Sequence, residues 1–147
     1  MVVPNAVLVN WRSELKKWLP SFRCVYYVGD REARLKEWQA HVESLQFNVM
    51  VTTYDYCMRD RAKLSRVQWQ YMVIDEAHRM KDRESKLSRD ISGFRTMRRL
   101  LLTGTPLQND ISELWSLLNL LLPDVFDNKA EFGAWFDSKP GESSEEE

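Results

Sequence analysis

Cysteine and histidine are both scarce in this 147-residue sequence, with two of each. Cys24 and Cys57 lie far apart and form no Cys-x-x-Cys pair, which indicates reduced thiols that fill a core in an intracellular protein. His41 and His78 are too few to build a cluster of metal ligands. The sequence therefore predicts neither a disulfide framework nor a protein-built transition-metal site.

Long apolar runs and a large net charge are also missing. The longest apolar run, residues 117–122, contains Asn119 and is far too short to span a bilayer. Met1 leads directly into Val2 and Val3 without the charged and apolar regions of a signal peptide. The net charge is −1, so any contact with nucleic acid must come from a local patch. We expect a soluble, intracellular chain.

Glycine is limited to five positions, 29, 93, 104, 133 and 141. None of them stands in a Gly-Lys-Thr or Gly-Lys-Ser sequence. The sequence therefore does not contain the P-loop that cradles the β- and γ-phosphates of a nucleotide.

What remains is ordinary globular composition, 44% hydrophobic and 12% aromatic, which suits one domain. Periodicity predicts alternating strands and helices, and this alternation favours an α/β fold with a parallel sheet and helices on both faces. The expected strands are the end of one at residues 1–3, then 23–28, 47–52, 71–75 and 99–102. The expected helices are 6–18, 31–44, 54–60, 84–91, 111–122 and 129–136. We expect one domain over residues 1–137 and a disordered acidic tail or linker stub over 138–147.

The most informative stretch is residues 71–79, YMVIDEAHR. Its first four residues suit a strand buried on both faces, and two adjacent carboxylates, Asp75 and Glu76, follow at once. Ligands bind beyond the carboxyl ends of strands in open α/β sheets. Nucleotide hydrolysis needs such a pair, one carboxylate to hold Mg²⁺ and the next to orient or deprotonate the attacking water. The alternative is a strand followed by a solvated acidic turn.

A second motif, Thr-Gly-Thr-Pro-Leu-Gln-Asn, occupies residues 103–109 and follows the expected strand 99–102. A glycine with hydroxyl neighbours at a strand's carboxyl end makes a tight loop whose amides can contact phosphate or nearby carboxylates. Alone, Gly-Thr-Pro is an ordinary turn. Its position, one strand and helix after the acidic pair, favours a functional loop.

These motifs resemble a known family. Asp-Glu-Ala-His at residues 75–78 is similar to the Walker B or DEAH box, motif II, of superfamily 2 helicases and translocases. Residues 103–109 resemble motif III of the Swi/Snf-type chromatin-remodelling ATPases, 4–11 resemble motif Ia and 51–54 resemble motif Ib. The likeness extends to about Pro140 and is greatest to the Brahma subgroup. An RNA helicase is disfavoured, because many of those carry Ser-Ala-Thr where this chain has Thr-Gly-Thr.

The resemblance implies the first, RecA-like lobe of a two-lobed translocase on double-stranded DNA, with the lobe's first strand and P-loop missing from this sequence. It implies ATP and Mg²⁺ as cofactors, nucleosomal DNA, the second lobe and Swi/Snf subunits as partners, no membrane, and a nuclear location. Asp75 would hold Mg²⁺ through water and Glu76 would activate water, while His78 and Arg79 would couple the site to motif III. The coupling residues of motif III would be Thr103, Gly104, Thr105, Gln108 and Asn109. The residues beside the DNA backbone would be Pro4, Asn5, Thr52 and Thr53.

Because the sequence contains no P-loop, a second function stays open: a non-catalytic truncated lobe that acts as an interaction module or pseudoenzyme. We expect the chain alone not to hydrolyse ATP. We also expect unpaired sheet edges, an exposed apolar face and a tendency to aggregate.

Two further features have a structural and a functional interpretation. The basic string Arg79, Lys81, Arg83, Lys86 and Arg89, with Arg95, Arg98 and Arg99 nearby, is either a solvated face or a patch that meets DNA or histones. Trp11, Leu15 and Trp18 recur at helical spacing, which indicates the inner face of a helix rather than a base-stacking platform.

Overall fold

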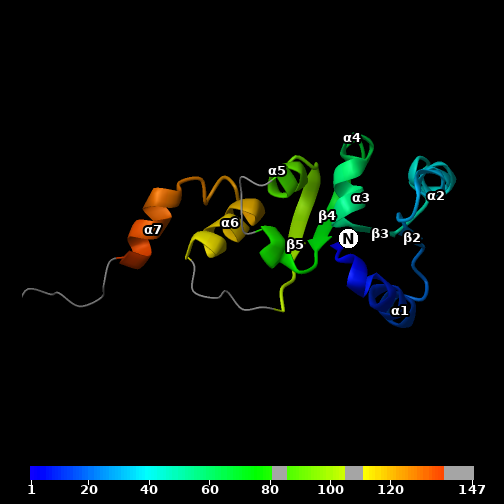
Figure 1. The fold of residues 1–147 in the computed structure, drawn as a ribbon, viewed down its shortest axis with the longest axis horizontal. Coiled ribbons are helices and arrows are strands. Elements are labelled where there is room, and N and C mark those ends of the chain that lie inside the picture. The colour runs from blue at the N-terminus through cyan, green and yellow to red at the C-terminus, as the bar shows by residue number, and fades with distance from the viewer. Residues whose placement is uncertain (81–85, 105–110, 138–147) are drawn as a thin grey trace, which may run out of the picture.

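The computed structural model describes residues 1–80, 86–104 and 111–137. Five strands form one sheet in the order β2-β3-β1-β4-β5, and every neighbouring pair is parallel (Figure 1). The strands are β1 (Val2–Val3), β2 (Cys24–Tyr26), β3 (Val49–Thr53), β4 (Trp69–Ile74) and β5 (Thr96–Leu101). The predicted parallel α/β sheet is therefore confirmed.

Helices connect the strands and cover the sheet. They are η1 (Asn5–Val7), α1 (Leu8–Trp18), α2 (Arg31–Glu37), η2 (Trp38–Val42), α3 (Tyr54–Arg59), α4 (Arg61–Leu64), η3 (Ala77–Met80), α5 (Lys86–Ser92), α6 (Ile111–Leu121) and α7 (Lys129–Asp137). In the described part of the chain, no helix is both long and apolar enough to cross a membrane.

The core has two parts because side chains alternate between the faces of each strand. On one face, Val2, Met50 and Ile74 pack with the inner sides of α3, α5 and α6. On the other face, Val3 and Val51 pack against Leu15 of α1. Full burial of each such side chain contributes roughly 1.5–3 kcal/mol to stability. Helices lie on both faces, as predicted.

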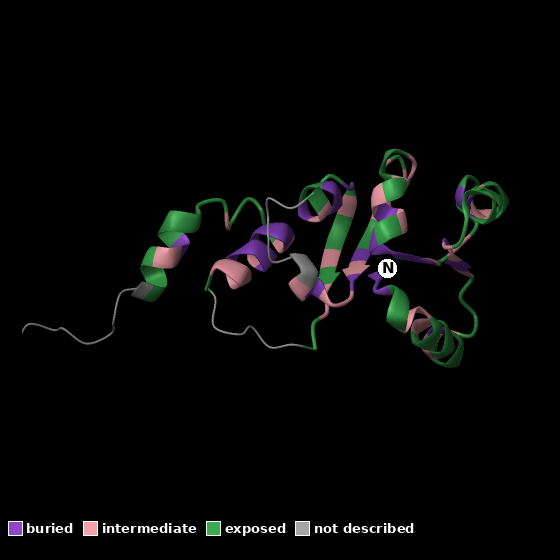
Figure 2. Cartoon of the chain, viewed as in Figure 1, coloured by how far each residue is buried: buried purple, intermediate pink, exposed green. Residues whose placement is uncertain are grey.

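Figure 2 shows buried residues along the central strands and α6, whereas α1 and α7 are largely exposed.

Two predictions about burial are wrong. Strand β4 is not buried on both faces: Met72 and Ile74 are buried, but Tyr71 is 57% exposed, and the guanidinium of Arg98 lies over its ring. The Trp11, Leu15 and Trp18 stripe is not all core, because Trp18 is 68% exposed and its indole N–H donates to Glu14 at 2.7 Å.

Candidate functional site

The residues of motifs II and III meet at the carboxyl edge of the sheet. Strand β4 ends at Ile74 and β5 ends at Leu101, and these two residues are in register. The pairing continues beyond both strands, because the amide of Ala77 donates to the carbonyl of Leu102 at 2.8 Å. On the other side of β4, the amide of Asp75 donates to the carbonyl of Val2 at 2.9 Å. The backbone of the acidic pair is thus fixed from both neighbouring strands.

Three groups hold Asp75. One carboxylate oxygen, Oδ2, accepts the indole N–H of Trp11 at 2.8 Å, and the other, Oδ1, accepts the amide of Glu76 at 2.9 Å. The Tyr54 hydroxyl donates to the Asp75 carbonyl, and it lies 3.4 Å from the carbonyl of Glu76. Asp75 therefore has a fixed backbone and a fixed carboxylate plane, although its side chain is only half-buried.

Glu76 has a left-handed backbone with φ of 54°. Non-glycine residues adopt this region at a cost of order 1–3 kcal/mol, and such residues cluster at functional sites. The carboxylate of Glu76 lies 3.0 Å from Nδ1 of His78, and the Thr103 hydroxyl lies 3.4 Å from the same nitrogen. Since that nitrogen carries one proton at most, it donates to the nearer carboxylate.

Gly104 approaches the same carboxylate from the motif III side, because a Cβ built on it would lie 4.0 Å from Oε1 of Glu76. The structure therefore brings five predicted residues together: Asp75, Glu76, His78, Thr103 and Gly104. Thr105, Gln108 and Asn109 lie outside the described residues, as does the side chain of Arg79.

A separate hollow lies near the carboxyl ends of β1 and β3. Asn5 and Thr53, both predicted to lie by the DNA backbone, line it together with Arg31, Arg34 and Arg59. Asp30, Asp55, Gly29 and Tyr56 complete its lining.

Thr53 is itself only 4% exposed, and the other two residues predicted at the DNA backbone also have internal positions. Pro4 is buried. The Thr52 side chain is 4% exposed, and its hydroxyl donates to the Tyr27 carbonyl at 2.8 Å. Thr52 thus joins β3 to the segment that follows β2, and its hydroxyl already has an acceptor inside the fold.

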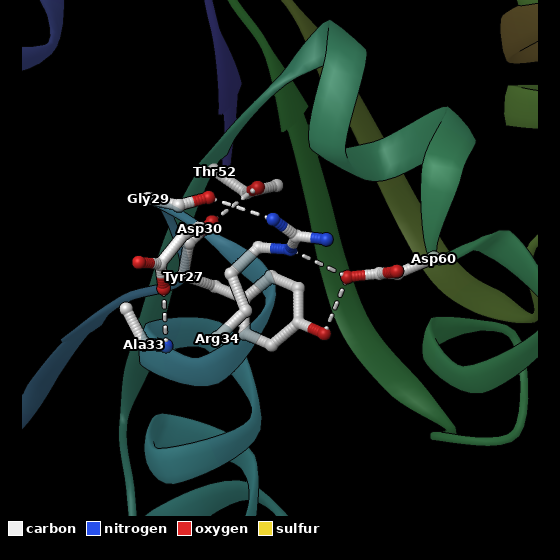
Figure 3. Close-up of polar contacts among 7 residues, drawn as sticks. All are labelled: Tyr27, Gly29, Asp30, Ala33, Arg34, Thr52 and Asp60. Atoms are coloured by element: carbon white, nitrogen blue, oxygen red, sulfur yellow. Dashed lines mark hydrogen bonds and ion pairs between the residues drawn. The ribbon is translucent and has the colours of Figure 1, made fainter.

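Arg34 is the anchored cation of this hollow (Figure 3). It donates to the Asp60 carboxylate at 2.7 Å and to the Gly29 carbonyl at 2.6 Å, and Tyr27 donates to the same carboxylate at 2.7 Å. Burial alone would raise the pKa of Asp60, but the hydrogen bonds from Arg34 and Tyr27 outweigh it and hold that pKa below its usual value. The carboxylate is therefore charged, and it fixes Arg34 in place.

Sequence reasoning missed three residues of these sites: Trp11, Tyr54 and Arg34. Sequence patterns treat Trp11 and Tyr54 as apolar residues. In the structure, the indole N–H of Trp11 and the hydroxyl of Tyr54 each bind a partner in another element. Arg34 belongs to a helix with many charged residues, which is the pattern of a helix on the surface. The signal for Arg34 was its place as a basic residue shortly after the turn at Gly29 and Asp30.

The described residues contain no group of three or more His, Cys, Asp or Glu side chains that could hold a metal ion. Mg²⁺ needs no such group, because it keeps several waters and binds through one or two carboxylates together with substrate phosphates. Asp75 fits this role: each of its oxygens accepts one hydrogen bond and keeps a lone pair for a water on the ion.

Comparison with known proteins agrees with this geometry. The chain is 64% identical over 136 residues to the Arabidopsis thaliana ATP-dependent helicase BRM, which covers 92% of this chain and 6% of that protein. It is 45% identical over 139 residues to the human SWI/SNF-related matrix-associated actin-dependent regulator of chromatin subfamily A member 1, covering 95% of this chain and 13% of that protein. The chain therefore spans only a small part of the length of these relatives.

Among solved structures, the Sulfolobus solfataricus SWI2/SNF2 ATPase core in complex with double-stranded DNA is similar, with a TM-score of 0.76 and 32% identity. The match covers 90% of this chain and 26% of that one. The RecA-like fold expected from the resemblance is thus confirmed. A family model, the SNF2-related domain, matches residues 1–147. The chain belongs to the SNF2-related family.

Proposed function

We propose that this chain is part of an ATP-dependent translocase on double-stranded DNA that remodels nucleosomes by coupling ATP hydrolysis to DNA movement. The observation that carries the proposal is the contact between the two motifs, in which His78 lies between the Glu76 carboxylate and the Thr103 hydroxyl. An acidic residue with a strained backbone at the carboxyl edge of a parallel sheet, in contact with the neighbouring strand's loop, suits a site that both hydrolyses a nucleotide and reports its state. The names of the relatives support the same activity.

The chemical roles follow from the contacts. When bound, Mg²⁺ would neutralise charge on the phosphates of ATP. Asp75 would hold the ion through water, because both of its oxygens keep a free lone pair. Glu76 would accept a proton from the attacking water, and the His78 contact at 3.0 Å fixes the direction of its carboxylate. His78 and Arg79 would pass the state of the site to motif III, the segment with Thr103, Gly104, Thr105, Gln108 and Asn109.

The DNA backbone would lie at the arginine-lined hollow. Asn5 offers an exposed amide there, and Arg31 and Arg59 are exposed cations, whereas Thr53 is only 4% exposed. Pro4 and Thr52 would shape this edge from inside the sheet. Contacts of these kinds bind phosphate without reading bases, which a motor that moves over any sequence requires. The second helicase lobe, Swi/Snf subunits and a nuclear location belong to the same proposal.

One observation favours a second candidate for this polypeptide by itself: its 147 residues include no Gly-Lys-Thr or Gly-Lys-Ser. Without a phosphate cradle, the lobe would act as a non-catalytic interaction module or pseudoenzyme. The two candidates differ in whether the geometry of the acidic pair is used for catalysis.

A grafted enzyme separates them. We define it as the Arabidopsis BRM helicase in which residues 1–147 of this chain replace the matching segment. We expect DNA-stimulated ATP hydrolysis by the grafted enzyme and none by the isolated chain. Glu76→Gln should lower the rate by about 10²-fold or more, because it removes the proton acceptor. Glu37→Gln is the matched control, since Glu37 also faces a histidine, His41, at 4.0 Å but lies on α2. Equal rates for the two variants would contradict the proposal.

A further inference from the structure

The indole of Trp11 spans two parts of the molecule. Its ring packs against the cluster formed by Val3, Leu15 and Val51, between α1 and the sheet. Its N–H leaves that apolar surface and donates to Oδ2 of Asp75, a residue 64 positions later in the sequence. A half-buried tryptophan thus ties the first helix to the first carboxylate of motif II.

The sheet register explains why the two residues meet. Val2 is in register with Ile74, and both lie on the face opposite to α1. Because side chains alternate along a strand, the next residue, Asp75, projects toward the face that α1 covers. Trp11 lies in the first half of α1, which follows β1 after the short η1 turn, and so reaches the carboxylate.

We propose that Trp11 is a positioning residue for Mg²⁺: its indole N–H orients the Asp75 carboxylate so that the free lone pairs face the ion's water shell. This inference rests on the proposed function, because it assigns a role within the same site. The amide of Glu76 holds Oδ1 and Trp11 holds Oδ2, so loss of either donor frees the carboxylate to rotate. An indole suits the task because it only donates and cannot lose its proton at physiological pH.

Trp18 provides an internal comparison. It lies on the same helix, and its N–H also donates to a carboxylate, that of Glu14, at 2.7 Å. That pair is on the surface, one helical turn apart, and 68% of the Trp18 residue is exposed. Any general effect of replacing a tryptophan on α1 should appear for both residues, whereas an effect on the ion should appear for Trp11 alone.

The first experiment tests the hydrogen bond in the 147-residue chain by NMR of the indole N–H groups, assigned with Trp11→Phe and Trp18→Phe. Asp75→Ala should move the Trp11 resonance upfield and speed its exchange with water by about tenfold or more, while Trp18 stays unchanged. Asp75→Asn should move it less in the same direction. Glu14→Ala should affect only Trp18. If the shift and exchange rate of the Trp11 resonance are the same in both Asp75 variants as in the unchanged chain, the inference is overturned, whatever the function of the chain.

The second experiment measures the Mg²⁺ dependence of ATP hydrolysis by the grafted enzyme. Trp11→Phe should raise the Mg²⁺ concentration for half-maximal rate by about 10-fold to 100-fold, the usual effect of losing a group that orients a metal ligand. Trp18→Phe should leave it unchanged. Replacing Trp11 with benzothienylalanine, which has the same shape and no N–H, should match Trp11→Phe and so excludes a packing effect.

The outcomes are distinguishable. If Asp75→Asn keeps full activity in the grafted enzyme, the proposed function fails, and with it the assignment of Mg²⁺ to this carboxylate. If Asp75→Asn abolishes activity but Trp11→Phe and its benzothienyl counterpart have the Mg²⁺ dependence of Trp18→Phe, the positioning role alone is overturned.

Discussion

Two non-glycine residues have a left-handed backbone among those described, Leu45 with φ of 55° and Glu76 with φ of 54°. Leu45 lies in an exposed loop, 64% accessible, where nothing but the turn requires this conformation. Glu76 lies at the junction of motif II with the strand that precedes it. At the residue scale, the strained backbone of Leu45 serves only a turn, whereas the strained backbone of Glu76 coincides with the proposed catalytic site.

Glycine at either position should relieve this strain. We expect Leu45→Gly and Glu76→Gly each to raise the free energy of unfolding by about 1 kcal/mol, since glycine adopts a positive φ freely. Urea denaturation of the chain measures both. In the grafted enzyme, Leu45→Gly should preserve ATP hydrolysis and Glu76→Gly should abolish it. Destabilisation by Glu76→Gly would show that its side-chain contacts outweigh the backbone strain.

The two cysteines differ in burial, and their thiols should therefore differ in reactivity as the pH changes. Desolvation raises the pKa of the Cys57 thiol to about 12, whereas Cys24 is only half-buried. We expect an alkylating reagent at pH 8 to modify Cys24 alone in the folded chain, and mass spectrometry of peptides checks this. Because the unfolded thiol ionises first, Cys57 contributes stability that is complete below pH 8.5 or so and is lost as pH rises toward 12. Cys57→Ala should remove this alkaline dependence.

The proximity of the acidic pair to Thr103 and Gly104 could be predicted, because each motif is local in sequence and follows a strand of one parallel sheet. The role of Trp11 could not, since periodicity counts tryptophan as apolar and does not show where its N–H points. The same limitation explains the wrong placement of Trp18 in the core. Helical spacing predicts which residues share one face of a helix. It does not show whether the sheet extends far enough to cover all of them, and Trp18 is left exposed.

At the scale of elements, α2 depends on its first residues. Asp30 caps this helix by accepting the amide of Ala33 at 2.8 Å, and Gly29 before it has φ of 102°, which only glycine adopts readily. Arg34, one turn further, reaches the Asp60 carboxylate only if this first turn is formed. The cap thus supports an arginine of the proposed DNA-facing hollow.

Removal of the cap should therefore weaken the fold. We expect Asp30→Ala to lower the free energy of unfolding by about 1 kcal/mol, the usual loss for an N-cap carboxylate. Asp30→Asn should cost much less, because asparagine caps helices equally well. Thermal denaturation followed by circular dichroism compares them, and equal losses for the two variants would show that charge, not capping, is the cause.

The predicted elements correspond to observed ones, with shifted ends. Strand β5 begins at Thr96 rather than at the predicted Arg99, because Thr96 and Arg98 pair with β4 although they resemble a polar loop. The predicted helix 31–44 changes character at η2, where Glu43 donates to the Trp38 carbonyl five residues back at 2.9 Å. Hydrophobic spacing does not reveal such π-type turns.

At the scale of the whole molecule, two surfaces that carry exposed cations are candidates for the proposed DNA contact. Arg31 and Arg59 lie at the hollow, and Lys86 and Arg89 represent the basic string on α5, all four of them exposed. Arg99, counted near that string in the sequence, is instead directed inward and donates to the Leu120 carbonyl at 2.7 Å. Lys81 and Arg83 lie outside the described residues.

Charge reversal decides between the surfaces. We expect Arg31→Glu with Arg59→Glu to weaken DNA binding by the grafted enzyme and to reduce the salt dependence of its affinity by about one counterion for each residue. The paired variant Lys86→Glu with Arg89→Glu should bind DNA as before. Fluorescence anisotropy at several salt concentrations measures both, with ATP affinity as the control. The reverse result would assign the DNA contact to the basic string.

The parallel sheet with helices on both faces was predictable, because helices and strands alternate along the chain. The strand order β2-β3-β1-β4-β5 was not, since no local pattern shows that β1 lies between β3 and β4. Likewise, the hollow combines Asn5 and Gly29, which follow β1 and β2, with Thr53, the last residue of β3. Such a site depends on topology, which a single sequence specifies only through its complete fold.

The central position of β1 has a consequence for how the chain folds. Its two residues are synthesised well before Thr52, Thr53 and Ile74, the residues with which they pair. Closing loops of this length costs conformational entropy before the strand contacts that offset this cost have formed. This slows the folding of parallel sheets. At about 5–20 residues per second, the nascent segment waits several seconds for its partners. During that interval Val2 and Val3 are unprotected apolar residues, so the time before β3 and β4 have been synthesised is the stage at which this lobe most needs a chaperone.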